Sequence, residues 1–353
     1  MNLSSAIKVL NIPPVGNPFF IRLCDELEKI GCAVSKDTRE FWQPTSRYDI
    51  LHLHFPEYLC ESNTTRSKEK HLICVKSYTD QLKYFRKAGT KIVWTAHNLK
   101  SHNPRYHNID KKIFSGTVDH CHGIILQADS GRHLLLDRHP GSQAKMLAVI
   151  HHGNYIDSYP DTVSRTEARR KLHISDDDIV FLCFGLIRSY KNLDLLVKGF
   201  NAAKRKNKKI KLFLVGQPFS IRTKINVRLL PLLNSRILTV PKFIAEEDVQ
   251  YYFKAADIGI FAYKDIFMSG GVILAESFGL PVIVPRSGCL PDYVTASTGF
   301  FYDPKKSFKD LADKINMAAE SDLKNMGQKA REFQLSNDWS TIAKQTRQFY
   351  STL

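Results

Sequence analysis

The stretch IGIFAYKDIFMSGGVILAESFGLPVIVP, residues 258–285, constrains the fold of this chain more than any other. It holds two apolar runs, Ile258–Ala262 and Pro281–Val284, on either side of a helical segment that Gly279 ends. Short apolar runs bounded by turn residues predict buried strands, and a glycine stop is typical of a helix C-terminus. Since parallel strands are joined through a helix, the stretch predicts a β-loop-α-β unit of a parallel sheet.

The glycines at the start of this predicted helix indicate an anion site. The backbone N–H groups at Ser269, Gly270 and Gly271 have no partner within the helix, and the helix dipole adds positive potential there. Glycine also lets a ligand's oxygens approach the backbone, so we expect a phosphate at this turn. About two turns further on, Glu276 is placed to accept hydrogen bonds from another part of the ligand, such as a ribose. An ordinary βαβ unit with a glycine-rich helix start is the alternative.

The rest of the second half repeats this rhythm. Further apolar runs at 179–184, 210–215 and 237–240 alternate with helical segments. This alternation predicts a parallel sheet whose two faces are covered by helices.

The loop Gly185–Asn192 follows the first of these runs. Arg188 and Lys191 are close enough to clamp one diphosphate, the arginine as a planar fork and the lysine as a point charge. Ligands of such sheets lie at the carboxyl ends of the strands. We therefore expect two anion-binding loops at one edge of the same sheet.

The first half begins as a doubly wound domain does. An apolar run at 6–12 leads through a proline-rich loop with Gly16 into an amphipathic helix at 19–30. The loop departs from G-x-G-x-x-G, which disfavours a nicotinamide enzyme. In the next strand, His52 and His54 share one face, and we interpret them as hydrogen-bonded structure, with a metal pair as the alternative.

Polar residues follow the central strands of this half. Glu57 comes after the strand that holds the two histidines, and the run Lys91–His97 ends at His97 and Asn98. Carboxyl ends of central strands are where ligands meet a sheet of this kind, so these three residues are candidate site residues.

The polar, turn-rich segment 153–170 predicts a domain linker. We expect an N-terminal Rossmann-like domain at 1–160, a C-terminal one at 161–336 and a last helix at 337–353. Asp176-Asp177-Asp178 contains D-x-D, a metal-holding pattern. It precedes a strand at its amino end, so we interpret it as a solvated turn.

The composition is globular and strongly basic. Fifty-one Lys and Arg face 35 Asp and Glu, a net charge of +16. This favours anionic small molecules or an anionic membrane, and nucleic acid is the weakest option. We interpret the basic helix 66–88 as packing its apolar stripe on the sheet, with contact to an anionic membrane as the alternative. No apolar run approaches the roughly 18 residues of a membrane span. The seven scattered cysteines indicate reduced thiols, so we expect a cytoplasmic protein, either free or peripheral at the inner face of the plasma membrane.

These features together resemble the GT-B glycosyltransferases, two doubly wound Rossmann-like domains facing a cleft. The likeness is strongest to glycosyltransferase family 4 and to bacterial exopolysaccharide β-mannosyltransferases that use GDP-mannose. The segments that carry it are Asp49–Glu57, Thr95–Leu99, Phe184–Lys191 and Tyr263–Glu276.

The resemblance implies a role for each candidate residue. Arg188 and Lys191 would bind the donor's diphosphate and offset the leaving group's charge, as a metal does elsewhere. Backbone donors at Ser269, Gly270 and Gly271 would bind phosphate or sugar, and Glu276 the ribose. Gly185 opens the diphosphate loop, Gly16 would let its own loop approach the donor, and His97 beside Asn98 would contact the transferred sugar. The resemblance implies neither a metal nor a cofactor.

One position departs from the family, which usually has two glutamates eight residues apart. Met268 stands eight before Glu276. The sugar and the stereochemical course therefore stay open; an inverting reaction would need a general base, for which Glu57 is the candidate.

The function expected is sugar transfer from a nucleotide diphosphate sugar, with GDP-mannose or a UDP-sugar as donor. The acceptor would be a saccharide, free or lipid-linked, in bacterial surface polysaccharide synthesis. A GT-B epimerase or phosphorylase, and a non-catalytic binding module, are the alternatives, because a fold alone does not fix a function.

Overall fold

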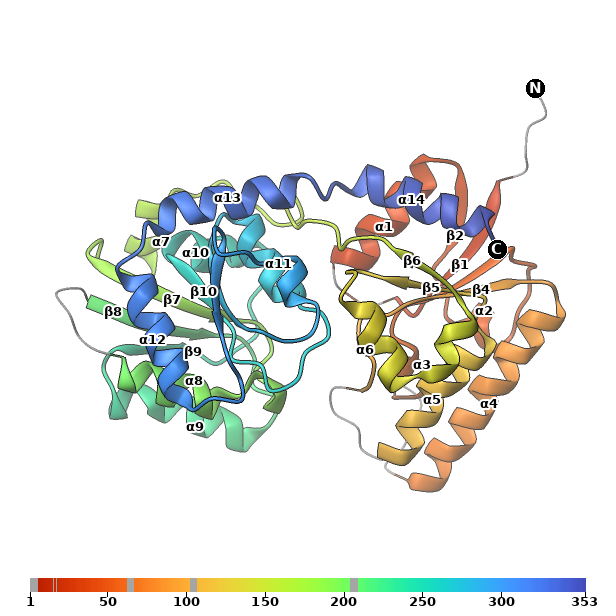
Figure 1. The fold of residues 1–353 in the computed structure, drawn as a ribbon, viewed down its shortest axis with the longest axis horizontal. Helices are drawn as coiled ribbons and strands as arrows, with labels where there is room; N and C mark the ends of the chain where they lie inside the picture. Colours follow the sequence, from red (N-terminus) through yellow and green to blue (C-terminus); the bar gives the residue numbers. More distant parts are fainter. Residues whose placement is uncertain (1–5, 15, 17, 62–66, 102–106, 204–208) are drawn as a thin grey trace. The chain divides into compact units, whose positions relative to one another are not determined.

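The computed structural model describes residues 6–14, 16, 18–61, 67–101, 107–203 and 209–353. The chain divides into two compact units (Figure 1). The first comprises Met1–Gly153 with Asn337–Leu353, and the second comprises Asn154–Ser336. The boundary between the two units therefore lies after Gly153, whereas we expected the domain boundary after residue 160. The last helix belongs to the first unit.

The first unit is built on a six-stranded parallel sheet with the strand order β2-β1-β3-β4-β5-β6. The strands are β1 (Ile7–Ile12), β2 (Cys32–Ser35), β3 (Ile50–Leu53), β4 (Lys91–Thr95), β5 (Gly123–Leu126) and β6 (Met146–Val149). The α-helices are α1 (Pro18–Lys29), α2 (Arg39–Trp42), α3 (Pro56–Glu61), α4 (Lys68–Lys87), α5 (His107–His120), α6 (Gly131–Arg138) and α14 (Trp339–Ser351).

The second unit has a parallel sheet of the same size with the order β12-β11-β10-β7-β8-β9. The strands are β7 (Asp178–Phe184), β8 (Lys209–Val215), β9 (Ile237–Val240), β10 (Ile258–Ile260), β11 (Val282–Pro285) and β12 (Gly299–Tyr302). The α-helices are α7 (Arg165–Lys171), α8 (Leu193–Ala202), α9 (Ile221–Leu233), α10 (Glu246–Ala255), α11 (Gly270–Ser277), α12 (Phe308–Ala319) and α13 (Leu323–Leu335).

The two sheets confirm the predicted α/β class with two doubly wound halves. Two edge strands, β2 and β12, were not predicted. Glu57 was expected in a loop and lies instead in the first turn of α3. Asp176 and Asp177 are exposed before β7, as expected for a solvated turn. Arg66, the expected start of α4, lies outside the described residues.

The strand orders mark one ligand-binding place in each sheet. In the first unit the chain reverses direction across the sheet between β1 and β3, and in the second between β7 and β10. A crevice opens at such a switch point, outside the carboxyl ends of the strands. The loops after these strands are therefore where functional residues are expected.

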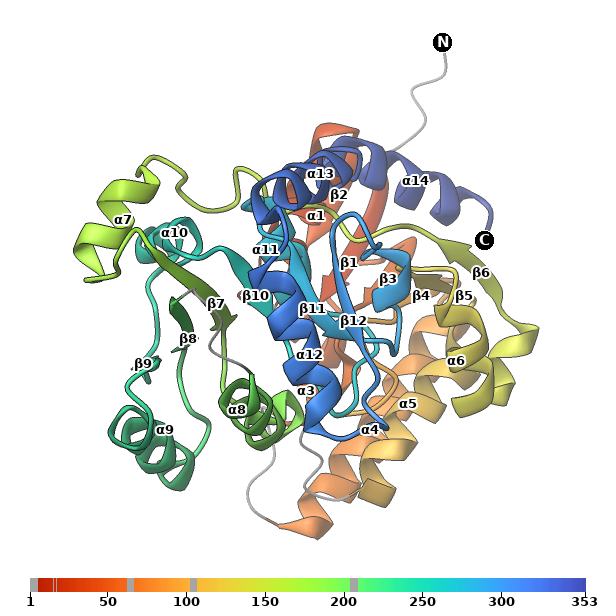
Figure 2. The ribbon, with the colours of Figure 1, turned by 60° about the vertical axis from the view of Figure 1, so that its left-hand side comes forward.

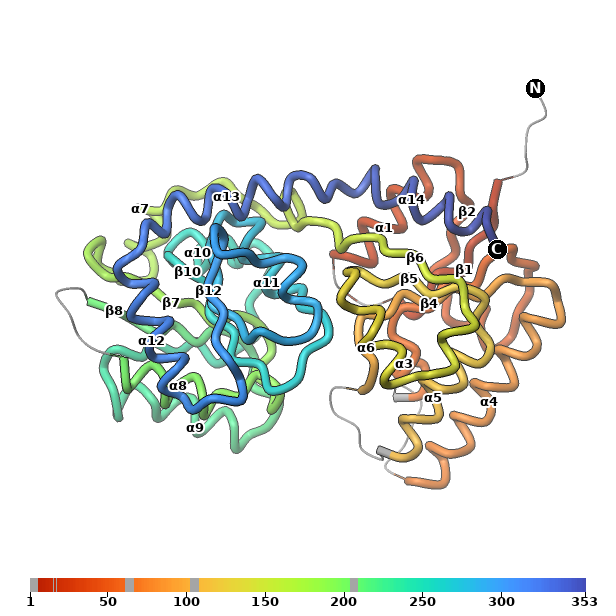
Figure 3. The backbone as a smooth tube through the Cα atoms, in the orientation of Figure 1, coloured from red at the N-terminus to blue at the C-terminus, as the bar shows by residue number. Residues whose placement is uncertain are grey.

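The chain passes out of α13 into α14 (Figure 3). Helix α14 packs on the first unit through aromatic side chains. The Trp339 ring lies 5.2 Å from that of Phe19 on α1, and both side chains are buried. Gly153 leaves space for the indole, because a Cβ there would stand 2.4 Å from Trp339. At the other end of the helix, the Tyr350 hydroxyl hydrogen-bonds His52 Nδ1 at 2.7 Å.

We predict that Trp339→Ala destabilises the first unit by about 3–5 kcal/mol, the usual cost of removing a large buried aromatic side chain. Hydrogen exchange of α1 and β1 peptides measures this loss, and urea denaturation followed by circular dichroism provides a second readout. Met317→Ala is the control, because Met317 is 50% exposed on α12. Unchanged exchange in the Trp339 variant would contradict this view of α14.

Candidate active site

The loop after β7 holds two of the predicted cations. Gly185 has φ +97°, a left-handed backbone conformation that favours glycine. The Arg188 guanidinium lies over the Phe219 ring, 5.1 Å from its centroid, and its buried Nε atom has no hydrogen-bond partner among the described residues. Arg188 is half-buried and keeps donors for an anion.

Lys191 lies beneath this loop. Its Nζ atom donates a hydrogen bond to the Phe184 carbonyl oxygen at 2.5 Å, and the residue is 7% exposed. Burial lowers the pKa of this ammonium group. Since an ammonium has three donors, two N–H groups remain for other partners. Lys191 thus holds the end of β7 in place. This structural role is additional to the predicted role of its charge in binding a diphosphate.

The loop after β10 ends at the capped N-terminus of α11. Ser269 Oγ accepts a hydrogen bond from the Val272 N–H at 3.3 Å and shares another with the Tyr263 hydroxyl at 2.7 Å. From the sequence, we explained Gly270 and Gly271 by ligand access alone. A Cβ on Gly270 would stand 3.0 Å from the Tyr155 hydroxyl, and one on Gly271 3.3 Å from the Phe261 ring. Close packing within the unit therefore also requires small residues here.

The two loops contact each other directly. The Lys264 N–H donates to the Tyr190 carbonyl oxygen at 2.8 Å, and the rings of Tyr190 and Tyr263 stack with centroids 5.8 Å apart. Their strands, β7 and β10, are neighbours at the switch point of the sheet. The structure thus brings both predicted anion-binding loops together.

Glu276 is fully buried on α11, which the sequence did not anticipate for a residue meeting a ribose. Its Oε2 atom accepts a hydrogen bond from Gln334 Nε2 at 2.6 Å, and its Oε1 atom has no partner among the described residues. Burial raises the pKa of this carboxyl to about 8, although the bond from Gln334 opposes the shift. The carboxyl group is therefore mostly neutral at pH 7. Gln334 was missed, because a glutamine on α13 has no sequence signal.

Gly288 is a second residue that the sequence analysis missed. It has φ +60°, and a Cβ there would stand 2.1 Å from the Ile266 carbonyl oxygen. Next to it, the Cys289 N–H donates to the Phe267 carbonyl oxygen at 2.8 Å. Only glycine allows this close approach to the loop that leads to α11. Met268, in the same loop, is buried.

In the first unit, residues after β3 and β4 meet at the carboxyl edge of the sheet. Asn98 Nδ2 donates a hydrogen bond to Glu57 Oε1 at 2.7 Å, and both residues are buried. The His97 ring stacks on Phe55 with centroids 4.4 Å apart. Gly16 is exposed in the loop after β1, where nothing lies within 4 Å of an added Cβ.

A hydrogen-bonded chain leads from β1 to His97. Asn11 Nδ2 donates to Cys24 Sγ at 3.0 Å, so its Oδ1 accepts from His54 Nε2 at 2.6 Å. A neutral His54 then accepts from His97 Nε2 through its own Nδ1 atom, 3.0 Å away. This chain assigns the proton of His97 to Nε2, and the Gln127 side chain also hydrogen-bonds the ring. Asn11 gave no sequence signal.

Three buried histidines at the ends of β3 and β4, His52, His54 and His97, are neutral. Burial lowers the pKa of His52 to about 3, and those of His54 and His97 well below the ordinary value. His52 hydrogen-bonds Thr95 as well as Tyr350. The prediction that His52 and His54 are hydrogen-bonded structure is confirmed. Among the described residues, no three His, Cys, Asp or Glu side chains are grouped as metal ligands.

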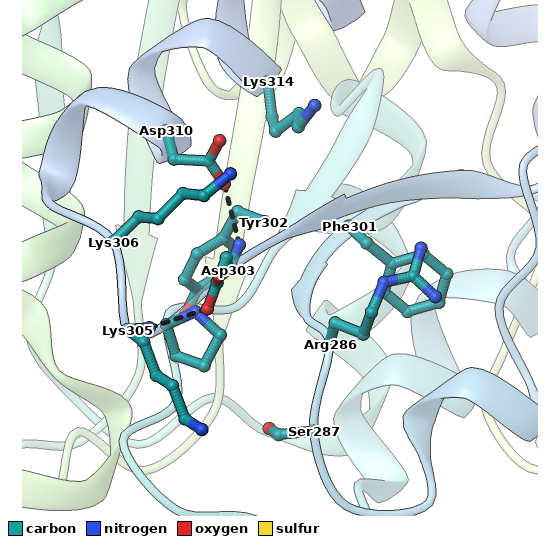
Figure 4. Close-up of a pocket in the computed structure, with 10 residues that line it drawn as sticks. Arg286, Ser287, Phe301, Tyr302, Asp303, Lys305, Lys306, Asp310 and Lys314 are labelled. Atoms are coloured by element: carbon teal, nitrogen blue, oxygen red, sulfur yellow. Dashed lines mark hydrogen bonds between the residues drawn. The ribbon is translucent and has the colours of Figure 1, made fainter.

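A separate pocket of about 510 Å³ lies beyond β11 and β12 (Figure 4). Arg286 stacks on Phe301 at its rim, with the guanidinium carbon 4.2 Å from the ring centroid. Asp310 Oδ2 accepts the Asp303 N–H at 2.7 Å and so fixes the loop before α12. Lysines 305, 306 and 314 complete a basic lining. The predicted site residues do not line this pocket.

We predict that Glu276 makes the protein less stable as pH rises from about 5 to 8. Its unfolded pKa is ordinary and its folded pKa is about 8, so between these values only the folded state holds the proton. The free energy of unfolding then falls by up to about 1.4 kcal/mol per pH unit. Urea denaturation across this range should show that Glu276→Gln removes the slope. The exposed Glu332→Gln is the control, and an equal slope in both variants would refute the assignment.

Residues 164–333 match the family described as Glycosyl transferases group 1. Two Xanthomonas campestris proteins named GDP-mannose:glycolipid 4-beta-D-mannosyltransferase are each 25% identical to the chain. The alignments cover 73% and 69% of this chain, and 68% and 62% of those proteins.

Two solved structures share the fold over nearly the whole chain. Sucrose-phosphate synthase from Thermosynechococcus elongatus has a TM-score of 0.75 at 16% identity, covering 99% of this chain and 98% of that one. Anabaena HepE in complex with UDP has a TM-score of 0.72 at 16% identity, covering 99% and 100%. Residues 164–333 thus match a group 1 glycosyltransferase domain, and the chain as a whole has the GT-B fold of two doubly wound α/β units.

Proposed function

We propose that this protein transfers a hexose from a nucleotide diphosphate sugar to a saccharide acceptor. The observation that carries the proposal is the contact between the loops after β7 and β10. It joins the Arg188 loop to the N-terminus of α11 at the switch point of the matched domain. An arginine fork and a helix N-terminus are both suited to the oxygens of a diphosphate.

The donor's diphosphate is assigned to Arg188 and Lys191, with the backbone of Ser269, Gly270 and Gly271. As the bond to the sugar breaks, negative charge grows on the leaving diphosphate, and fixed cations stabilise that charge without rearrangement. The ribose is assigned to Glu276. Its Oε1 atom supports this role, because it has no partner in the described part of the chain and buried polar atoms normally have one.

The first unit is assigned the transferred sugar. His97 offers a neutral ring at the carboxyl edge of the sheet, and Asn98 orients Glu57. Glu57 is the general base if the reaction inverts configuration, and a retaining reaction needs none. Gly16 is assigned to the approach of its loop to the donor.

A lipid-linked saccharide is the proposed acceptor, in the synthesis of a bacterial surface polysaccharide. The similarity to the Xanthomonas mannosyltransferases supports this choice, since their name specifies a glycolipid. It also favours GDP-mannose over a UDP-sugar as donor. Among the described residues, no helix has the length and apolar character needed to cross a membrane. The acceptor would therefore be met by peripheral association with the cytoplasmic face.

We predict that Arg188→Ala lowers kcat/KM by about 10²–10³-fold, the typical cost of losing one donor to a developing anion. Arg188→Lys should recover part of this loss, since it restores charge without the fork. Nucleoside diphosphate release with acceptor present measures the rate. Arg170→Ala, an exposed arginine on α7, is the control. Full activity of the Arg188→Ala variant would overturn the diphosphate assignment.

We predict that Glu57→Gln lowers kcat without weakening donor binding. Glu57→Gln keeps an oxygen to accept the hydrogen bond from Asn98, so the fold and donor binding should persist. Loss of a general base should lower kcat by roughly 10²–10⁴-fold. Product analysis by NMR should then show inversion in the wild type. An unchanged kcat with a retained anomeric configuration would refute the role.

A further inference from the structure

One stretch of this chain has a large net positive charge. Residues 195–245 contain twelve Lys or Arg and no Asp or Glu, against a net charge of +16 for the whole sequence. Helix α9 lies within this stretch. In Figures 1 and 2 it stands at the margin of the second unit, and no other described element of that unit covers its outer side.

The outer face of α9 is apolar, the reverse of an ordinary surface helix. Its buried face contacts the core through Val227, which is fully buried, and Leu230. The exposed apolar side chains recur at helical spacing on the opposite face. They are Ile221 (79% exposed), Ile225 (53%), Leu229 (47%), Leu232 (80%) and Leu233 (82%). Single exposed apolar residues need no explanation, but five on one face indicate a binding surface.

Exposed cations flank this apolar face. Arg222, Lys224 and Arg228 come from the same helix, and none forms an ion pair with a described acidic residue. A protein partner for so basic a surface would need a matching acidic one. A second copy of this chain would bring α9 cations against α9 cations, which is repulsive.

We propose that α9 binds the surface of an anionic lipid bilayer. A helix with an apolar outer face and flanking Lys and Arg lies in the membrane interface, its side chains reaching the acyl boundary and its cations the headgroups. At 13 residues it is about 20 Å long, too short to span the membrane. The charge matches the negative cytoplasmic leaflet.

Helix α4, the sequence-based candidate for this role, fits less well. Its exposed apolar residues are Leu72, Ile73 and Tyr84, and Tyr84 lies about three turns from the other two. Acidic residues Glu69 and Asp80 lie on the same helix. Binding through α9 therefore moves the expected membrane surface from the first unit to the second.

Vesicle sedimentation tests this proposal without donor or acceptor, so its outcome is independent of the proposed glycosyl transfer. The protein is mixed with vesicles of phosphatidylcholine, with or without phosphatidylglycerol. The apolar variant is Ile225→Ser with Leu232→Ser and Leu233→Ser. The charge variant is Arg222→Gln with Lys224→Gln and Arg228→Gln, and the matched control on α4 is Leu72→Ser with Ile73→Ser and Tyr84→Ser.

We expect the wild type and the α4 control to sediment with the anionic vesicles. Binding should weaken at least tenfold in the apolar variant and roughly a hundredfold in the charge variant, from about 1 kcal/mol per cation. Melting temperatures and stabilisation by nucleoside diphosphates should be unchanged, because the substituted side chains are exposed. Wild-type binding by both α9 variants would overturn the proposal. The proposal would also be overturned if the wild type did not sediment with anionic vesicles but formed a dimer, measured by light scattering, that the apolar variant did not form.

Discussion

The candidate donor site depends on the contact between the loops after β7 and β10. The hydrogen bond from Lys264 to the Tyr190 carbonyl oxygen and the stacked tyrosine rings fix one loop against the other. Parallel β-sheet topology makes this contact possible, because neighbouring parallel strands end at the same edge. Gly288 also allows the loop after β11 to pack closely against the loop that leads to α11. The cation of one loop and the helix N-terminus of the other are thus held in place before any ligand binds.

The two units solve the problem of polar burial in different ways. In the first, buried histidines and Asn11 satisfy one another in a chain that ends at His97. Burial lowers the pKa values of His54 and His97, so this hydrogen-bonded chain stays neutral. In the second, Glu276 is buried with one hydrogen-bonded oxygen and one that no described residue contacts through a hydrogen bond, and its pKa is raised to about 8. We propose that a bound ligand supplies the missing hydrogen bond of Glu276.

The parallel sheets and the loops that end their central strands could be predicted from sequence, because buried strands and glycine-rich turns leave local signals. Other features are long-range and leave none. Gln334 reaches Glu276 from 58 residues away, and Tyr350 reaches His52 from 298 residues away. The packing of Tyr155 against Gly270 depends on tertiary contacts, so the glycine pattern suggested ligand access alone. The apolar face of α9 was missed because its buried face is apolar too.

The proposed donor site can be tested by thermal stabilisation of the purified protein with UDP, GDP, ADP, CMP and their sugar conjugates. A ligand that binds only the folded state stabilises it by about 2.7 kcal/mol at a hundredfold excess over Kd, which raises the melting temperature. We expect a selective rise with one nucleoside diphosphate and its sugar conjugate. A melting temperature unchanged by every one of these ligands would contradict a donor site on this sheet.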